Sequence, residues 1–227
     1  MVFFIYQVQV MLRLALATAF CAFVATTTIV SAGELSVGAT VIAKAGINTE
    51  IPDGAKTDYN FNSLPDLNVS ALYLFSRGSN TGIHLDLGYD TYSFKMRPEN
   101  DLASNDKTTS ISTYNNFSIA PSLYLGGFQL GVAFGIPMGY TEKSVDGTID
   151  NTATIKALIG DPVVTTELRL GVMIPIHNGK DSRLNFNIRG GYMLNSMHDN
   201  GFLDDDDFVP RAASLGVGLS YYFTVLD

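Results

Sequence analysis

The sequence has few cysteines and few charged residues. Its 227 residues include a single cysteine, Cys21, and 14 basic against 22 acidic side chains, a net charge of −8. One cysteine excludes an internal disulfide and a site built from several thiolates. Nucleic-acid binding relies on clustered lysine and arginine, so the acidic balance excludes that class of partner. Charged residues make up 16% of the chain, below the roughly 25% of soluble domains, which indicates a membrane setting or a deeply buried sheet.

The first 32 residues have the composition of a signal peptide. Arg13 is their only charged residue, and the uncharged apolar run after it ends in Val30–Ala32. Small residues three and one before a break suit signal peptidase, so we expect cleavage there and a mature domain of residues 33–227. A start at Met11 and an uncleaved anchor helix are the alternatives. Because Cys21 lies in this leader, the mature chain has no cysteine.

After residue 33, apolar and polar residues alternate with a period of two, which predicts β-strands. In the clearest case Ile83, Leu85 and Leu87 alternate with His84 and Asp86. A strand places these two sets on opposite faces, whereas a helix would mix them. We expect eight such strands, at residues 35–45, 67–77, 83–94, 114–126, 128–140, 164–174, 184–194 and 213–223.

The uncharged stretch 117–140 also admits another interpretation. Gly127, Gly131 and Gly135 recur at four-residue spacing, so a helix here would be a membrane span with a glycine packing face. Two prolines within the stretch and the turn pair Gly126-Gly127 favour a hairpin instead.

The connections between the strands alternate strictly between short and long. In an up-and-down meander, alternate connections lie at the same end, so one rim has three tight turns and the other has four long loops. This profile is typical of a bacterial outer-membrane barrel with periplasmic turns, periplasmic termini and extracellular loops. The predicted fold is therefore all-β, an eight-stranded antiparallel up-and-down transmembrane β-barrel. The long connections are residues 47–66, 96–111, 141–162 and 196–210.

A soluble lipocalin-like barrel is the main alternative fold, and the composition of the polar face argues against it. That face is rich in small residues, which suit a crowded interior, and its few charges have both signs. We expect Asp86, Glu167, Arg169 and Arg189 to form a salt-bridged plug in a lumen that side chains fill, rather than a selectivity filter. Aromatic residues near the strand ends suit interfacial girdles, namely Tyr89, Tyr92, Phe94, Phe128, Tyr140, Tyr192, Tyr221, Tyr222 and Phe223.

The leader, the eight strands and the closing strand, residues 215–223, resemble the small outer-membrane β-barrel family that includes the OmpA transmembrane domain and OmpX-type proteins. The likeness spans the mature chain and is architectural. It implies that Tyr221 and Phe223 belong to a signal read by the barrel-assembly machinery. Thr224–Asp227 follow this signal here, whereas in the family the aromatic residue normally ends the protein.

Catalytic motifs are absent from the sequence. It has no glycine-serine nucleophile elbow, phosphate loop or zinc-ligand motif. Ser196, His198 and Asp199 lie close together but lack a spacing that requires a catalytic triad. We therefore expect no catalytic residues and no cofactor. A narrow ion or solute channel is the alternative function, and a lipid-A-modifying enzyme is the third.

The acidic residues concentrate in the predicted long loops. These loops hold 16 of the 22 acidic side chains and 5 basic ones. The run Asp204, Asp205, Asp206 and Asp207 offers oxygen ligands for Ca²⁺ or Mg²⁺, which also bridge the lipopolysaccharide around an outer-membrane protein. It lacks the spacing of an EF-hand, and like-charge runs are usually only solvated. We expect a non-enzymatic protein with a structural or surface-interaction role, in contact with outer-membrane lipid and lipopolysaccharide.

Overall fold

The computed structural model describes residues 33–51, 54–98, 109–198 and 210–226. The predicted leader, residues 1–32, and the run Asp204–Asp207 lie outside these ranges. No helix within them is long and apolar enough to cross a membrane. Within these ranges the elements are β1 (Glu34–Asn48), β2 (Ala55–Phe61), β3 (Asp66–Leu74), β4 (Thr81–Pro98), β5 (Ser110–Leu125), β6 (Phe128–Ser144), α2 (Thr152–Ile159), β7 (Thr165–Asn178), β8 (Ser182–Met193) and β9 (Ala212–Leu226).

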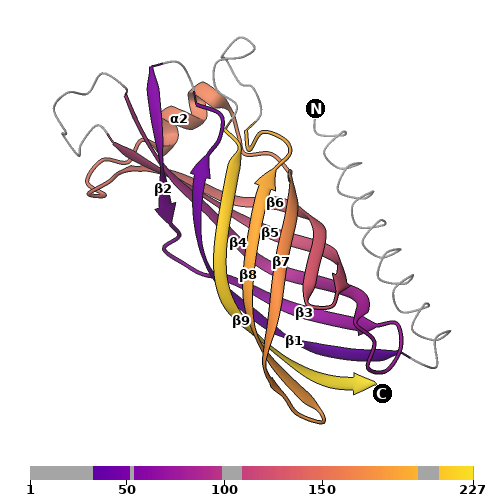
Figure 1. Ribbon diagram of the computed structural model, residues 1–227. Coiled ribbons are helices and arrows are strands. Elements are labelled where there is room, and N and C mark those ends of the chain that lie inside the picture. Colours follow the sequence, from indigo (N-terminus) through magenta and orange to yellow (C-terminus); the bar gives the residue numbers. More distant parts are fainter. Residues whose placement is uncertain (1–32, 52–53, 99–108, 199–209, 227) are drawn as a thin grey trace, which may run out of the picture.

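Eight of the strands close into a ring of antiparallel pairs, in the order β1-β3-β4-β5-β6-β7-β8-β9 (Figure 1). The last strand returns to the first, with a ladder from Asn48↔Ala212 to Leu35↔Leu226. The turn at Gly126-Gly127 has φ values of 60° and 97°, a left-handed conformation that glycine adopts without strain. The predicted hairpin and the predicted fold class are both confirmed.

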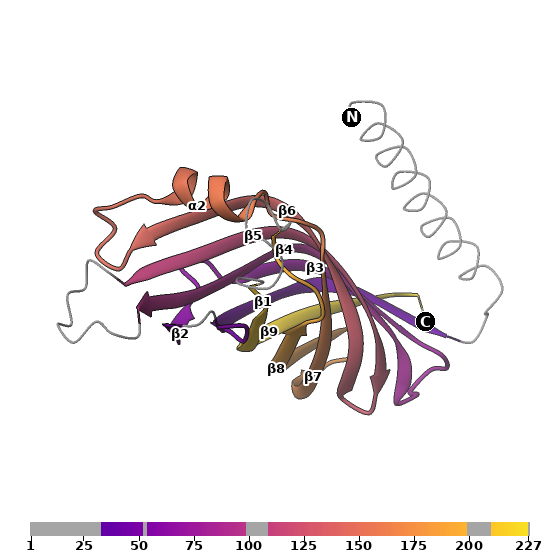
Figure 2. The same cartoon turned by 90° about the horizontal axis from the view of Figure 1, so that it is seen from above.

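The two ends of the barrel differ. At one end lie the tight turns, residues 75–80, 126–127 and 179–181, together with the start of β1 and the end of β9. We call this end the turn rim. The opposite end, where β1 and β6 finish, carries the long connections, and we call it the loop rim. Towards the loop rim β4, β5 and β6 extend well beyond the other strands (Figure 2).

A loop is predicted over residues 47–66, and this prediction is wrong for residues 55–61, which form the strand β2. This strand pairs with the far end of β4, from Ala55↔Pro98 to Tyr59↔Phe94, and touches β1 at Ala45↔Phe61. It lies in line with β3, so the two act as one descending strand interrupted at residues 62–65. Its polar sequence hid it, because only Tyr59 and Phe61 supply an apolar alternation.

A second part of the predicted loops also has regular structure. Within the predicted loop 141–162, residues 152–159 form the short helix α2. Its Ile155 packs against buried side chains at the loop rim, so the helix covers part of the barrel mouth. Eight residues are too few for a clear helical period, and this is why the sequence did not reveal it.

The barrel is apolar outside and polar inside. Among the described residues, the fully buried side chains comprise 26 polar or charged and 14 apolar ones, whereas large apolar side chains such as Leu123, Leu215 and Leu170 are about half exposed. On β5 the outward residues are apolar across the segment from Phe117 to Leu125, a span of nine residues, which matches the roughly 9–11 that a tilted transmembrane strand needs. A soluble barrel would have the opposite arrangement, so the lipocalin-like alternative does not describe this chain.

Four of the aromatic residues expected in the interfacial girdles lie inside the barrel instead. Tyr92, Phe94, Tyr140 and Tyr222 are at most 7% exposed. Each of them occupies one of the alternate positions of its strand that face inward, and their rings fill the narrow lumen. For Tyr140 a bulge in β6, where Asn115↔Gly139 is followed by Asn116↔Pro137, sets this parity. Position near a strand end therefore did not identify the lipid-facing aromatics.

Candidate functional site

The centre of the lumen contains a cluster around Arg169 of β7. Its guanidinium forms ion pairs with Asp90 and Glu167, and all three side chains are at most 8% exposed. Tyr92 donates its hydroxyl hydrogen to Glu167 Oε2 at 2.8 Å and accepts a bond from Arg169 Nη2 at 3.1 Å. One cation thus balances two carboxylates in a closed space, where an unpaired charge would be costly.

A second buried pair joins this cluster through the ring of Tyr92. Lys44 Nζ lies 2.8 Å from Asp66 Oδ2 and 3.7 Å from the centroid of the Tyr92 ring. Asp66 also accepts a hydrogen bond from the backbone N–H of Thr91 at 2.9 Å. Thr91 lies opposite the interruption between β2 and β3, so its N–H has no strand partner on that side. The predicted loop 47–66 includes Asp66, and this prediction is wrong because β3 begins at that residue and directs its side chain inward.

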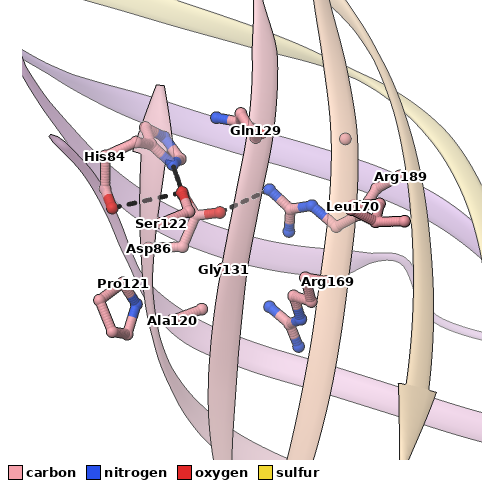
Figure 3. Close-up of a pocket in the computed structure, with 11 residues that line it drawn as sticks. His84, Asp86, Ala120, Pro121, Ser122, Gln129, Gly131, Arg169, Leu170 and Arg189 are labelled. Carbon is pink, nitrogen blue, oxygen red and sulfur yellow. Dashed lines mark hydrogen bonds and ion pairs between the residues drawn. The ribbon is translucent and has the colours of Figure 1, made fainter. Parts of the chain in front are cut away.

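A third group of charges lies closer to the turn rim (Figure 3). Arg189 Nη2 of β8 lies 2.5 Å from Asp86 Oδ2 of β4, and Ser70 donates to the other oxygen of Asp86 at 2.5 Å. His84 Nε2 lies 3.4 Å from Asp86 and 2.7 Å from the hydroxyl oxygen of Tyr222. β8 and β9 lie across the ring from β4, so the Arg189–Asp86 and His84–Tyr222 contacts cross the lumen, whereas Ser70 is the cross-strand neighbour of Asp86.

The structure places all four predicted lumen charges inside the barrel, but in two groups. Glu167 and Arg169 belong to the central cluster, and Asp86 and Arg189 to the group near the turn rim. The sequence placed Asp90 among the charges of the polar face but not in the predicted plug, and it did not identify Lys44. Both have the inward parity of their strands, which was the available signal, but β1 alternates too weakly for Lys44 to stand out.

Ser122, His84 and Asp86 lie in the order of a catalytic triad, which the sequence did not suggest. Ser122 Oγ is 3.4 Å from His84 Nδ1, and His84 Nε2 is 3.4 Å from Asp86. The cavity beside them has a volume of about 10 Å³, room for about one water molecule. The Ser122 hydroxyl also contacts the backbone oxygen of His84 at 3.4 Å.

The loop-rim side of the lumen is closed by an aromatic and methionine cap. Phe94, Tyr114, Tyr140 and Met193 pack together there, and Met197 from the connection after β8 completes the cluster. On the loop-rim side of Tyr140, the buried Glu142 accepts hydrogen bonds from Tyr140, at 2.8 Å, and from Ser112. Glu142 is therefore a lumen residue, although we had assigned it to a loop.

His198 lies outside the strands and holds two loop-rim connections together. Its Nδ1 donates to the backbone oxygen of Gly160 at 3.0 Å, and its ring lies 5.3 Å from that of Tyr114 and 4.8 Å from that of Tyr140. Ser196 Oγ contacts the backbone N–H of His198 and not its ring. Asp199, the third of the residues noted together in the sequence, lies outside the described residues.

Acidification is expected to loosen the cap through His198. Burial lowers the pKa of His198 to about 4 from 6.5, although Gly160 and Asp161 favour the charged form. The unfolded chain therefore binds the proton first, so the stabilisation present above about pH 6.5 is lost as the pH falls towards 4. NMR titration of the His198 ring and tyrosine fluorescence would follow the change.

The control for this titration is a ring that cannot gain a proton. His198→Phe should keep the packing and remove the pH dependence between 4 and 6.5, whereas His177→Phe at the turn rim should leave it unchanged. A cap that becomes more stable as the pH falls through this window would contradict the assignment.

At the turn rim the lumen opens into a cavity of about 410 Å³. Its walls include the apolar Leu72, Leu74 and Met173 and the polar Asn178 and Arg183. The buried side chains above this cavity separate it from the loop rim. Within the described residues no three His, Cys, Asp or Glu side chains come together to hold a metal ion.

The residues of the expected assembly signal lie on the outer face of β9 near the turn rim. Tyr221 and Phe223 are about half exposed, and their rings meet edge to face with centroids 4.8 Å apart. The strand does not end with them, since β9 continues to Leu226 and pairs there with Leu35. The residues after Phe223 therefore extend the final strand.

Comparisons with known proteins concern the fold. Neither the family models nor the curated proteins give a match. Solved structures that resemble the chain include the outer membrane protein AlkL in lipid bilayers (15% identity, 87% of this chain and 93% of that one, TM-score 0.41) and Ail, the attachment invasion locus protein of Yersinia pestis (14%, 84% and 97%, TM-score 0.33). OprG from Pseudomonas aeruginosa is a third (11%, 86% and 94%, TM-score 0.32). With its closed ring, apolar exterior and charged interior, this chain is an eight-stranded β-barrel of the outer-membrane type.

Proposed function

We propose that the chain is a non-enzymatic outer-membrane barrel with a closed lumen and a structural or surface-interaction role at its loop rim. The observation that carries this proposal is the sequence of barriers across the lumen. From the turn rim to the loop rim, the Asp86–Arg189 pair, the Arg169 cluster and the cap around Tyr114 follow one another. Eight strands enclose a space that side chains can fill, and here they close it above the turn-rim cavity.

The proposal includes an orientation. The tight turns and both ends of the barrel domain face the periplasm, and the loop rim faces the exterior. The acidic side chains then belong to the outer surface, where they favour basic partners and repel anionic solutes. Some of them are held by neighbours, such as Asp161 by Lys156 at 2.7 Å and Glu50 by Arg211 at 3.3 Å.

An enzymatic role is disfavoured by the lack of room at the serine–histidine–aspartate group. The cavity of about 10 Å³ next to Ser122 would have to admit an acyl chain. Lipid A mass spectra should be identical in cells with and without the protein, and a shift in acyl content would contradict the proposal.

Planar-bilayer recording tests the closed lumen. The wild-type protein is expected to show no single-channel steps, because each barrier consists of paired or packed side chains. His198→Ala, which weakens only the cap, should remain closed, since the ionic layers below it are intact. Regular conductance steps in the wild-type protein would favour the narrow-channel alternative instead.

A further inference from the structure

The outer wall of β5 changes from apolar to polar beyond Phe117, at Asn115 and Thr113. Tyr89, Phe117 and Ile136 lie side by side on β4, β5 and β6, through the pairs Tyr89↔Phe117 and Phe117↔Ile136. Towards the loop rim, the outward residues of β5 are Asn115, Thr113 and Ile111. This level therefore marks the edge of the hydrocarbon region, and the surface beyond it lies among lipid headgroups.

A trough lies on the outer wall directly beyond this edge. It has a volume of about 350 Å³, and its floor carries hydroxyl and amide groups from Thr113, Asn115 and Thr141. Leu64 borders it on one side and Val145 on the other. The hydroxyl of Tyr89 donates to Asn115 Oδ1 at 2.7 Å, which fixes the amide at the lower end of the trough.

Lys143 lines the far end of the trough, and Lys95 lies in the same row of the sheet. Lys95 and Lys143 flank Ile111 in a single row, through the pairs Lys95↔Ile111 and Ile111↔Lys143. Strands in a sheet are about 4.8 Å apart, so the two backbones are separated by about 10 Å. Within the described part of the chain, neither ammonium group has a carboxylate within 4.0 Å.

The loop carboxylates near Lys143 also accept hydrogen bonds from neighbouring loop groups. Asp150, which pairs across from Lys143, accepts the hydroxyl of Thr152 at 2.5 Å and its backbone N–H at 3.0 Å. Asp146 accepts the hydroxyl groups of Ser144 and Thr148. Asp58, which pairs across from Lys95, lies 3.6 Å from Arg97, so the two lysines share the rim with carboxylates but form no close ion pair with them among the described residues.

We propose that this trough binds the headgroup of a phosphorylated glycolipid of the surrounding outer leaflet. Lys95 and Lys143 meet its phosphates, and Thr113, Asn115 and Thr141 meet its sugar hydroxyl groups. Its acyl chains continue over Phe117, which is 40% exposed on the apolar band below. A soluble anion would use the lysines but not this continuous apolar surface, so the arrangement favours a lipid. The inference rests on the proposed orientation of the loop rim.

Binding of purified lipid A to the full-length protein in phosphatidylcholine nanodiscs tests this site. Bisphosphorylated lipid A is titrated beside the same lipid after enzymatic removal of its phosphates. Each lysine near an anionic headgroup contributes about fivefold in affinity, so K95Q/K143Q should bind bisphosphorylated lipid A roughly 30-fold more weakly than wild type. The wild-type protein should lose a comparable factor when the phosphates are removed.

Two further variants control this comparison. K156Q/K180Q removes the same charge away from the trough and should bind like wild type. Ile111→Lys places a third cation between the two lysines and should tighten binding. Heat-modifiable migration in gels establishes that each variant is folded before its affinity is measured.

Three results would overturn the proposal. They are equal affinity of wild type and K95Q/K143Q, equal affinity for the phosphorylated and dephosphorylated lipid, and competition by millimolar inorganic phosphate that abolishes lipid binding. The last result would assign the lysines to a soluble anion. None of these results changes the expected absence of conductance, so failure of the lipid site is distinguishable from failure of the closed-lumen proposal.

Discussion

Replacing Arg169 with methionine is expected to lower the free energy of unfolding of the barrel by about 3–5 kcal/mol, the usual cost of breaking a buried ion pair. The guanidinium is the cation that pairs with both Asp90 and Glu167, and all three side chains are buried. Without it, two carboxylates face each other in a closed space. Urea unfolding of the protein in phosphatidylcholine vesicles, followed by tyrosine fluorescence and by gel migration, measures the loss.

A surface arginine provides the matched control. Arg97 lies 3.6 Å from Asp58, and both side chains are about half exposed, so Arg97→Met should cost less than about 1 kcal/mol. The triple variant R169M/D90N/E167Q, which removes the stranded charges together with the cation, should recover much of the loss. The assignment fails if R169M unfolds at the same urea concentration as the wild-type protein.

Replacing Gly191 with valine is the second change with a large expected effect. A Cβ atom at this inward position of β8 would overlap the carboxylate of Glu167 and lie 2.8 Å from the hydroxyl of Ser214. Overpacking alone costs about 1–3 kcal/mol. Since the displaced group is a buried carboxylate bonded to Arg169 and Tyr92, we expect about 3 kcal/mol or more in the same unfolding assay.

The adjacent residue separates this effect from a general intolerance of glycine replacement. Gly190 faces outward, and the nearest atom to a Cβ there is 3.8 Å away, an ordinary contact. Gly190→Val should therefore change the stability little. Equal losses for the two variants would show that crowding around Glu167 is not the cause.

The barrel was predictable from the sequence because a sheet with one face in lipid must alternate. Each of the eight predicted strands has a counterpart in the ring, and short and long connections occur in the expected order. The parts that escaped prediction lie beyond the lipid. Beyond Tyr140 the outer end of β6 has polar side chains on both faces, and in β2 only Tyr59 and Phe61 alternate with polar residues, so no sustained hydrophobic period marks these segments.

The lumen network was only partly predictable for a related reason. Parity identifies inward residues such as Arg169, but it does not say which inward residues meet across the barrel. Arg189 and Asp86 meet because β8 and β4 face each other at the same height, which depends on strand tilt and on register. The bulge in β6 also reverses the parity of its outer end, and a single sequence does not reveal it.

The pairing of inward charges across the lumen sets an order for assembly. Arg183 meets Glu34 from 149 positions away, and His84 meets Tyr222 from 138 positions away. These partners come together only once the first and last strands have joined. A lysine or arginine at the bilayer midplane on the lipid-facing side costs about 2–4 kcal/mol, so single strands with their charges unpaired would enter hydrocarbon poorly. Closure of the ring must therefore precede or accompany insertion, and a chain that stalls before β9 pairs with β1 would be left outside the hydrocarbon core.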